Sequence, residues 1–454
     1  MSTQVPLALR GFILDAPSPK SARGFRDGAV LIREGKIAAV GDHEEIRQLP
    51  EARDAIWSGG PHHAIVPGLI DLHAHIPQYP VVGRIEESLL PWLQRYIFPR
   101  EREFRAETAR EFAPYFFKEL ARNGTTLAVL YAAIFEDSCH ECFAAAEVSG
   151  SRAIIGKIMM DRGSYGGLEE TKIPALSLEQ TRRLIKRWHG AAGGRLGYAV
   201  SPRFAITCTA ELMKAAGELA REHGTWIQTH LSENHLEIQT VRELFPDSPD
   251  YTSVYAECGL TGPRSIFGHC IHLSERETSI LADSGSLIAH CPTSNLFLRS
   301  GILPWEKITS AEIPFGLGSD VAGGPELSMW RVMRSALESQ IARSFHEKSP
   351  IPTPAEIFYQ TTLGAAKALQ MDSRIGSIEP GKDADLVVLD LAEVIPSAGG
   401  PVLDRDTGAE DLLSLLIHRA GPEATVLTMV QGRETFSRKA SAGGNDHEAR
   451  HQAR

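Results

Sequence analysis

Short apolar runs alternate with amphipathic, helix-like segments through the middle of this chain. Helix-like segments such as Ala106–Asn123 and Ala210–His223 are each followed by a glycine, a common helix stop. This alternation predicts βα units, and eight of them over residues 66–375 suit an α/β protein with a (β/α)8 TIM-like barrel. A doubly wound open sheet is the alternative, which the lack of a GxGxxG loop after the first strand disfavours. The expected strands are Ile65–Leu69, Thr125–Tyr131, Ala153–Met159, Leu196–Val200, Thr225–Gln228, Ser265–Gly268, Ser286–Ala289 and Ile313–Gly316.

Strand-like runs separated by turns also occupy both ends of the chain. They are Leu7–Leu14, Gly28–Ile32, Lys36–Val40, Gly376–Leu391 and Ala424–Phe436. We expect residues 1–65 and 376–438 to join in one small composite β-sandwich domain, with the barrel inserted between them. Residues 439–454 are polar and lack an apolar period, so we expect this tail to be disordered.

Composition narrows the partners and the compartment. The net charge is −10 without a long basic run, which argues against a nucleic-acid backbone as partner. No run of 18 apolar residues and no signal-peptide pattern are found, so neither a membrane nor an export route is expected. Six cysteines in 454 residues do not resemble a disulfide framework, and a cytoplasmic location fits best. Cys139 and Cys142 form a CxxC pair on a helix-like stretch; without a second pair, a structural zinc or redox role is the less favoured interpretation.

Candidate chemistry begins with the motif PGLIDLHAHIPQ at residues 67–78. Side chains alternate along a strand, so His73 and His75 point the same way and can bind one transition metal. For an isolated HxH motif, two solvated histidines at a strand terminus would be the better interpretation. Residues further along the chain favour the metal site.

Polar residues recur where the later strands are expected to end. In a barrel of this kind, catalytic groups lie at the C-terminal ends of the strands. The fifth strand ends at His230, the sixth at His269 and the eighth at Asp320. Three imidazoles and one carboxylate, with a position open for water, are the ligands of a catalytic zinc site, or alternatively iron. We therefore assign as ligands of one metal ion per chain His73, His75, His230 and Asp320.

The same strand ends supply groups for proton transfer. Asp320 is expected to accept the first proton from the activated water, and His269 to hydrogen-bond that water. Glu233 follows His230 by three residues and is expected to carry a proton to a ring nitrogen and then to the leaving group. The alternative for Glu233 is an exposed glutamate that opens a helix. His290 is expected to support a loop instead of the metal.

These residues and their surroundings resemble the amidohydrolase superfamily and, within it, the guanine deaminases. The resemblance covers about residues 28–436 through PGLIDLHAHIPQY, LLPWLQRYIFPRE, SPRFAITCT, THLSEN, YTSVY, AHCPTSNLFLRSG, GLGSDVAGG and GSIEPGKDADLVVLD. It implies a distorted barrel, one zinc ion, a composite β domain, and hydrolysis of guanine to xanthine and ammonia by attack of water at C2. A homodimer is also expected.

The resemblance further implies that three side chains bind the purine. They are Gln78, Arg203 and Phe204: the guanidinium would donate to O6 and N7, the amide would donate and accept, and the ring would cover a face. A structural ion pair is the alternative for Arg203. The segment Ile76–Arg100 would cover the pocket with Leu89, Leu90, Trp92 and Leu93, or else pack on a neighbouring subunit.

Other activities keep the same machinery. The substrate could be another aminopurine such as 8-oxoguanine, a pterin or an s-triazine. A non-catalytic scaffold on the same fold is the alternative from a different class, and the complete ligand set argues against it.

Overall fold

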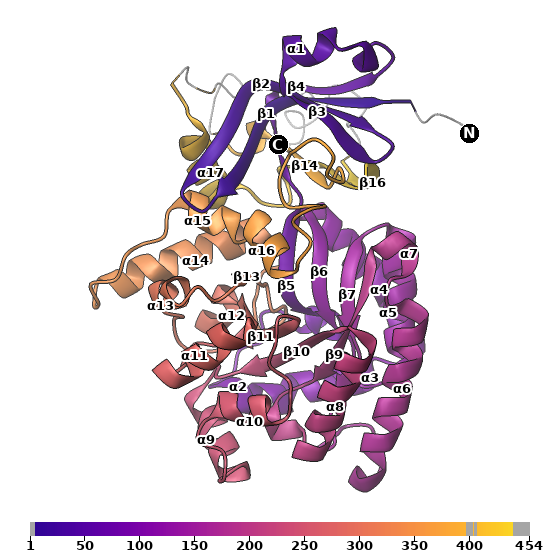
Figure 1. Ribbon diagram of the computed structural model, residues 1–454, viewed down its shortest axis with the longest axis vertical. Helices are drawn as coiled ribbons and strands as arrows, with labels where there is room; N and C mark the ends of the chain where they lie inside the picture. Colours follow the sequence, from indigo (N-terminus) through magenta and orange to yellow (C-terminus); the bar gives the residue numbers. More distant parts are fainter. Residues whose placement is uncertain (1–4, 396–402, 404–405, 439–454) are drawn as a thin grey trace, which may run out of the picture.

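A computed structural model describes residues 5–395, 403 and 406–438 as a barrel with a smaller β sheet stacked on one end (Figure 1). The tail expected to be disordered, 439–454, lies outside the described residues. No helix in the described ranges has the length and apolar character needed to cross a membrane.

Eight parallel strands form the barrel, and a short ninth strand, β8, pairs with β9. The barrel is closed where the ends of the first and last strands meet. The Asp320 N–H donates to the His73 carbonyl at 2.7 Å, and the His75 N–H donates to the Val321 carbonyl at 3.1 Å. The strands are β5 Leu69–His75, β6 Thr125–Tyr131, β7 Arg152–Gly156, β8 Ile158–Met159, β9 Leu196–Pro202, β10 Trp226–Leu231, β11 Ser265–His269, β12 Leu287–His290 and β13 Phe315–Leu317.

The first barrel strand differs from its expected position. The run Ile65–Leu69 falls mainly in β4 (Ile56–Pro67), which belongs to the accessory sheet, whereas β5 starts at Leu69. Pro67 and Gly68 separate the two strands, and the Gly68 N–H donates to the Asp385 carbonyl at 2.9 Å. Since proline has no N–H to donate, the ladder of β4 stops there. The HxH motif therefore lies within β5 and not beyond its end.

Most helices cover the outside of the barrel, whereas α2 lies at its C-terminal end. The short ones are α2 Leu89–Trp92, α3 Phe98–Glu103, α7 Ala191–Gly194, α10 Tyr251–Glu257, α12 Pro292–Phe297, α13 Trp305–Ser310, α15 Pro354–Tyr359 and α16 Leu363–Ala368. The longer ones are α4 Ala106–Arg122, α5 Glu136–Ser149, α6 Ile173–Trp188, α8 Ala210–His223, α9 His235–Leu244, α11 Glu275–Ser284 and α14 Met329–Ser344.

Helix α8 shows how local sequence sets these elements. The Thr209 side chain accepts a hydrogen bond from the Leu212 N–H at the N-terminus, and Gly224 ends the helix with a φ of +62°. Leu212, Met213 and Ala216 are buried, and their helical spacing turns this face toward the barrel.

The accessory sheet joins the two ends of the chain. Its strand order is β16-β15-β14-β4-β1-β2-β3. All seven strands of the expected β-sandwich domain therefore belong to one continuous sheet. The Ile37 N–H donates to the Lys382 carbonyl and the Ala384 N–H to the Gly35 carbonyl, both at 2.9 Å, which brings distant parts of this sheet together around an apolar core. Besides β4, its strands are β1 Leu7–Ser18, β2 Ser21–Arg33, β3 Lys36–Asp42, β14 Leu386–Asp390, β15 Thr425–Val430 and β16 Arg433–Ser437. The same parts of the chain contain the helices α1 His43–Gln48 and α17 Ala409–Arg419.

Buried ion pairs fasten the barrel to this sheet. Arg152 opens β7, and its guanidinium contacts Asp385 at 2.5 Å and Asp383 at 2.7 Å. Lys36 and Arg374 also pair with Asp383, at 2.9 and 3.0 Å. These contacts account for the first two of the three aspartates in the closing GKDADLVVLD motif.

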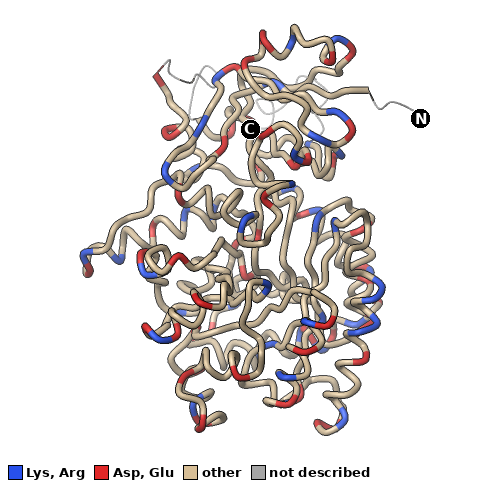
Figure 2. Tube along the Cα trace, viewed as in Figure 1, with Lys and Arg blue, Asp and Glu red and all other residues tan. Residues whose placement is uncertain are grey.

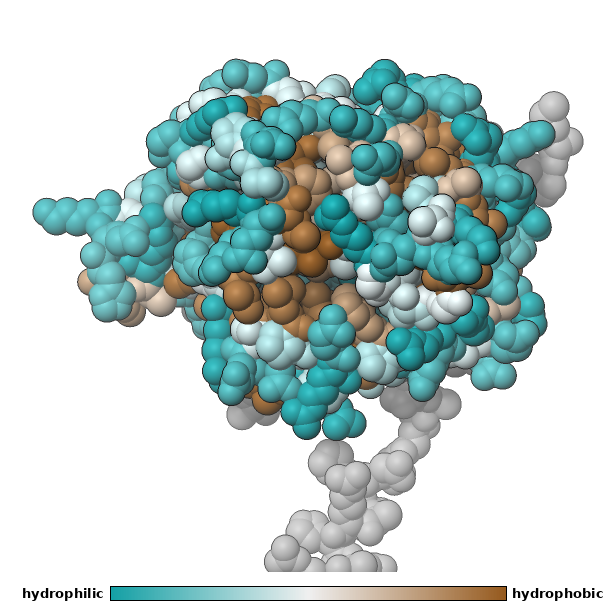
Figure 3. Space-filling model, turned by 90° about the horizontal axis from the view of Figure 1, so that it is seen from below, coloured by the Kyte–Doolittle hydropathy of each residue, from teal (hydrophilic) through white to brown (hydrophobic). Residues whose placement is uncertain are grey.

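The two ends of the barrel therefore differ. Its strands point away from the accessory sheet (Figure 1), and that far end presents apolar residues in a central area bordered by polar ones (Figure 3). Lys and Arg alternate with Asp and Glu around the outer helices (Figure 2). The open, C-terminal end of the barrel is where a site is expected.

Candidate metal centre and substrate pocket

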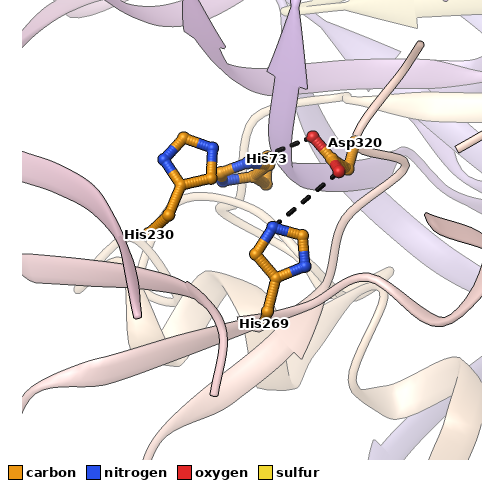
Figure 4. Close-up of side chains that lie close together, drawn as sticks. All are labelled: His73, His230, His269 and Asp320. Carbon is orange, nitrogen blue, oxygen red and sulfur yellow. Dashed lines mark ion pairs between the residues drawn. The ribbon is translucent and has the colours of Figure 1, made fainter. Parts of the chain in front are cut away.

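Five side chains that can bind a metal converge at the C-terminal end of the barrel. His73 and His75 come from β5, His230 from β10, His269 from the end of β11, and Asp320 follows β13. One atom from each of His73, His230, His269 and Asp320 lies within 4.8 Å of the other three (Figure 4). All five are buried except His230, which is half-buried.

Several short distances join the four residues that the sequence analysis assigned as ligands. The Asp320 Oδ1 atom lies 3.3 Å from His73 Nε2 and 3.2 Å from His75 Nε2. The Nε2 atoms of His75 and His230 lie 3.3 Å apart. Two donors that bind one zinc ion at tetrahedral angles lie about 3.4 Å apart. His269 Nε2 lies farther away, 3.8 Å from Asp320 Oδ2, on the side of Glu233.

The protonation and hydrogen bonding of the imidazoles also suit the binding of a divalent ion. His73 Nε2 and His269 Nε2 are buried and have no hydrogen-bond partner among the described residues. Burial lowers the pKa of His75 to about 4, and burial with the neighbouring His73 lowers the pKa of His230 well below its usual value. Imidazoles must be neutral to bind a metal, so this group is ready to do so. Burial would raise the pKa of Asp320, but its close contacts with the His73 and His75 rings outweigh this effect, and the pKa falls well below its usual value.

Outer contacts orient the imidazoles. The Arg203 carbonyl lies 2.7 Å from His230 Nδ1, so this nitrogen donates and Nε2 faces the centre. The Asn295 Oδ1 atom lies 2.9 Å from His269 Nδ1 and fixes that ring in the same way. His269 and Asp320 have φ angles of +70° and +47°, a strained conformation that is typical of functional sites.

Asp71 joins the first and last strands beneath the site. Its carboxylate accepts hydrogen bonds from the Ser319 hydroxyl at 2.6 Å, from the Ser319 N–H at 2.9 Å and from the His73 N–H at 3.1 Å. Burial raises its pKa to about 6. These bonds position both His73 and the loop that carries Asp320, a role the sequence alone did not indicate.

Glu233 lies beside the metal group. It is 2% exposed, so the alternative of an exposed residue that opens a helix is wrong. Its Oε1 accepts a hydrogen bond from the Ser300 hydroxyl at 3.1 Å, and its Oε2 lies 3.4 Å from His269 Nε2. Burial, followed by the charge of Asp320, raises its pKa well above the usual value, as a group that donates protons near neutrality requires.

A small cavity adjoins these groups. Gln78, Arg203 and Phe204, the expected substrate-binding residues, all line it. Three apolar residues of the segment Ile76–Arg100 also contribute to the wall. The complete lining is His75, Gln78, Leu89, Trp92, Leu93, Arg203, Phe204, His230, Glu233, His269, Leu298 and Asp320.

Glu101 is a buried residue beside this cavity that sequence reasoning missed. Its carboxylate forms an ion pair with Arg203 and accepts a hydrogen bond from Gln78 Nε2 at 2.8 Å. Arg203 therefore takes part in an ion pair, as the alternative interpretation expected, and it also lines the cavity. Glu101 lies in the motif LLPWLQRYIFPRE, but nothing in the spacing pointed to its partners.

Other candidates lie away from the centre. The His290 ring packs edge-on against Trp305 with 6.2 Å between centroids, and burial lowers its pKa to about 3. Cys139 and Cys142 are buried on the inner face of α5, where burial raises the pKa of both thiols far above the usual value.

Comparison with known proteins gives a consistent picture. Residues 64–435 match the amidohydrolase family, and residues 28–52 match an imidazolonepropionase-like composite domain of bacteria. The chain is 38% identical to the guanine deaminase of Escherichia coli (strain K12), over 92% of each chain. The crystal structure of guanine deaminase from Bradyrhizobium japonicum superposes with a TM-score of 0.87 at 30% identity, over 96% of this chain and all of that one.

A guanine deaminase from C. acetobutylicum, solved with guanine bound in its active site, superposes with a TM-score of 0.86 at 29% identity, over 95% of this chain and all of that one. Family membership and the His/Asp group together indicate a divalent metal site. The chain belongs to the amidohydrolase family, and the relatives it resembles within that family are guanine deaminases.

Proposed function

We propose that this protein is a zinc-dependent guanine deaminase that hydrolyses guanine to xanthine and ammonia. The observation that carries the proposal is that Glu233, His269 and Asp320 line the same cavity as Arg203 and Gln78. The similarity to guanine deaminases over nearly the whole chain favours guanine as the substrate.

His73, His75, His230 and Asp320 would hold the ion. Three imidazoles and a carboxylate form a donor set that suits zinc, with iron as the alternative. When bound, such an ion lowers the pKa of water to about 7 and so supplies a nucleophile at neutral pH.

The protein's own groups then move the protons. Asp320 accepts a proton from the attacking water, and His269 holds that water toward C2 of the purine with its Nε2 atom. Glu233 passes its proton to ring atom N3, then takes a proton from the hydroxyl formed at C2 and passes it to the exocyclic amine. The C2–N bond breaks as the C2 carbonyl forms, the amine leaves as ammonia, and the proton held by Asp320 returns to Glu233. The raised pKa of Glu233 suits this role because the group must both donate and accept near pH 7.

Other residues bind the base and exclude water. Arg203 and Gln78 provide polar atoms for the edge of the purine, and Phe204 covers a ring face. Leu89, Trp92 and Leu93 close the cavity with apolar surface, which lowers the local dielectric around the reacting atoms.

We place this activity in purine catabolism, since it removes nitrogen from a free base. All six cysteines are free, which suits a cytoplasmic location. We also propose domain limits of 1–65 with 376–438 for the β domain and 66–375 for the barrel. The homodimer stays a prediction.

A substrate panel tests the proposal. Purified protein with measured metal content is given guanine, 8-oxoguanine, a pterin and an s-triazine, and ammonia release is measured. We expect guanine to have the highest kcat/KM by at least about tenfold, a difference of about 1.4 kcal/mol in transition-state binding. A higher value for another ring would contradict the proposal, and no turnover of any compound by metal-loaded protein would favour a scaffold.

A further inference from the structure

Glu101 accepts from three donors inside the protein, and two of these donors belong to residues proposed to bind the base. It belongs to α3 and is fully buried. Gln78 Nε2 donates to its Oε1 at 2.8 Å, the Tyr165 hydroxyl donates to its Oε2 at 2.7 Å, and the Arg203 guanidinium pairs with the same oxygen. These three partners come from three separate segments of the chain.

The carboxylate constrains the Gln78 amide. An ionised carboxylate only accepts hydrogen bonds, so it must face the nitrogen of the amide and never its oxygen. The oxygen of Gln78 therefore lies on the other edge of the amide, in a side chain that lines the cavity. The pocket thus gains an acceptor in a fixed position.

Glu101 constrains Arg203 as well. Arg203 is 2% exposed, and a buried cation needs a nearby negative charge. Burial would lower the pKa of Arg203, but the charge of Glu101 outweighs it and keeps the group cationic. The guanidinium also lies over the Phe98 ring, 5.0 Å from its centroid, and Phe98 packs beside Tyr165. Arg203 is therefore held on two sides while it lines the cavity.

We propose that Glu101 is a positioning residue that determines specificity, because it fixes the acceptor of Gln78 and the donors of Arg203 as a pattern complementary to a 2-amino-6-oxopurine. Such a ring presents an N1–H donor beside an O6 acceptor, and Gln78 and Arg203 supply the matching atoms. This inference rests on the proposed function, since it assigns the selectivity of the same pocket.

A purely structural role predicts something else. If Glu101 only neutralised Arg203, its removal would weaken binding of every purine to a similar extent. If Glu101 fixes the donor and acceptor pattern of the pocket, its removal would mainly weaken the binding of ligands with the 6-oxo and N1–H groups. Binding of 2-aminopurine, which lacks both groups, would change little.

The experiment measures binding in the metal-loaded Glu233→Gln variant, which should not consume its ligands. Glu101→Gln is added to it, and Glu103→Gln serves as the matched control, because Glu103 lies on the same helix with a side chain that is 70% exposed. Guanine and 2-aminopurine are titrated by calorimetry, and metal content and thermal unfolding are recorded. The glutamine at position 101 can donate to the Gln78 oxygen, which allows the Gln78 amide to flip.

We expect Glu101→Gln to raise the Kd for guanine by about 10- to 150-fold, the range for a hydrogen bond to a charged group, and the Kd for 2-aminopurine by less than about fivefold. Metal content should not change, and Glu103→Gln should match its parent. Equal losses for both ligands, or a guanine Kd within about threefold of the parent, would overturn the inference.

Glu101→Asp keeps the charge if the glutamine variant does not fold. The carboxylate is then one methylene shorter, so an intermediate loss confined to guanine is expected, and unchanged guanine binding would refute the positioning role. Turnover by the wild-type protein separates the two proposals. If wild-type protein does not deaminate guanine but the binding pattern holds, the proposed function fails and the role of Glu101 stands.

Discussion

Glu233→Gln is the substitution that most directly separates metal binding from proton transfer. The amide has nearly the shape of the carboxyl group, and its oxygen can still accept from the Ser300 hydroxyl, now 3.1 Å from Glu233 Oε1. It cannot pick up a proton and pass it on. Glu233 is not one of the four proposed ligands, so the ion should remain bound.

The size of the effect follows from the position of the group. Glu233 is 2% exposed, so bulk water cannot readily replace it as a proton carrier. A positioned acid or base contributes about 100- to 10,000-fold to a rate, which corresponds to about 3–5 kcal/mol in the barrier. We expect kcat to fall within that range while KM for guanine changes little.

The assay follows conversion of guanine to xanthine by ultraviolet absorbance, with metal content measured on the same sample. Glu243→Gln is the matched control, because Glu243 is an exposed glutamate on the adjacent helix α9. A Glu233→Gln protein that carries its metal and retains more than a tenth of the wild-type kcat would refute the assignment of Glu233 as proton carrier.

Three further substitutions test other parts of the account. Arg203→Ala should raise KM for guanine by about 10- to 150-fold, with a smaller change in kcat, and a change mainly in kcat would argue against a binding role. Lys157 is buried beside the Ser177 hydroxyl, and burial lowers its pKa from 10.5 to about 8, so the unfolded chain binds more protons between these pH values. The free energy of unfolding therefore gains up to about 3 kcal/mol from this group as pH increases from 8 to 10.5. In urea unfolding, Lys157→Met should lack this rise and should be more stable than the wild type at pH 7. Parallel pH profiles of the two proteins would contradict this. Arg152→Leu should cost about 3–5 kcal/mol in urea unfolding, because it leaves the buried Asp385 without this cation, and a loss under 1 kcal/mol would mean that the barrel and the sheet hold together without it.

The metal group could be predicted from the sequence because each ligand lies at or next to a barrel strand. In a parallel barrel all the strand ends meet, so His230 and Asp320 are neighbours in space although 90 residues separate them in the chain. The alternation of a strand was enough to place His73 and His75 on the same side. His269 was expected near the reacting water and lies beside Glu233.

The first barrel strand and Glu101 show where that reasoning fails. Two consecutive apolar strands that belong to different sheets have the same pattern, and only the Pro67–Gly68 break separates them. Glu101 binds partners carried by helices and irregular segments, where no repeat fixes direction. Its role depends on how the segment from 76 to 103 folds over the barrel, which periodicity does not determine.

Anomalous diffraction at the zinc absorption edge, from crystals of the protein grown without added metal, is the most direct test of the central claim. We expect one strong peak per chain, within about 2.0–2.2 Å of His73 Nε2, His75 Nε2, His230 Nε2 and an oxygen of Asp320. A peak held by any other set of side chains, or no peak in protein that deaminates guanine, would contradict it.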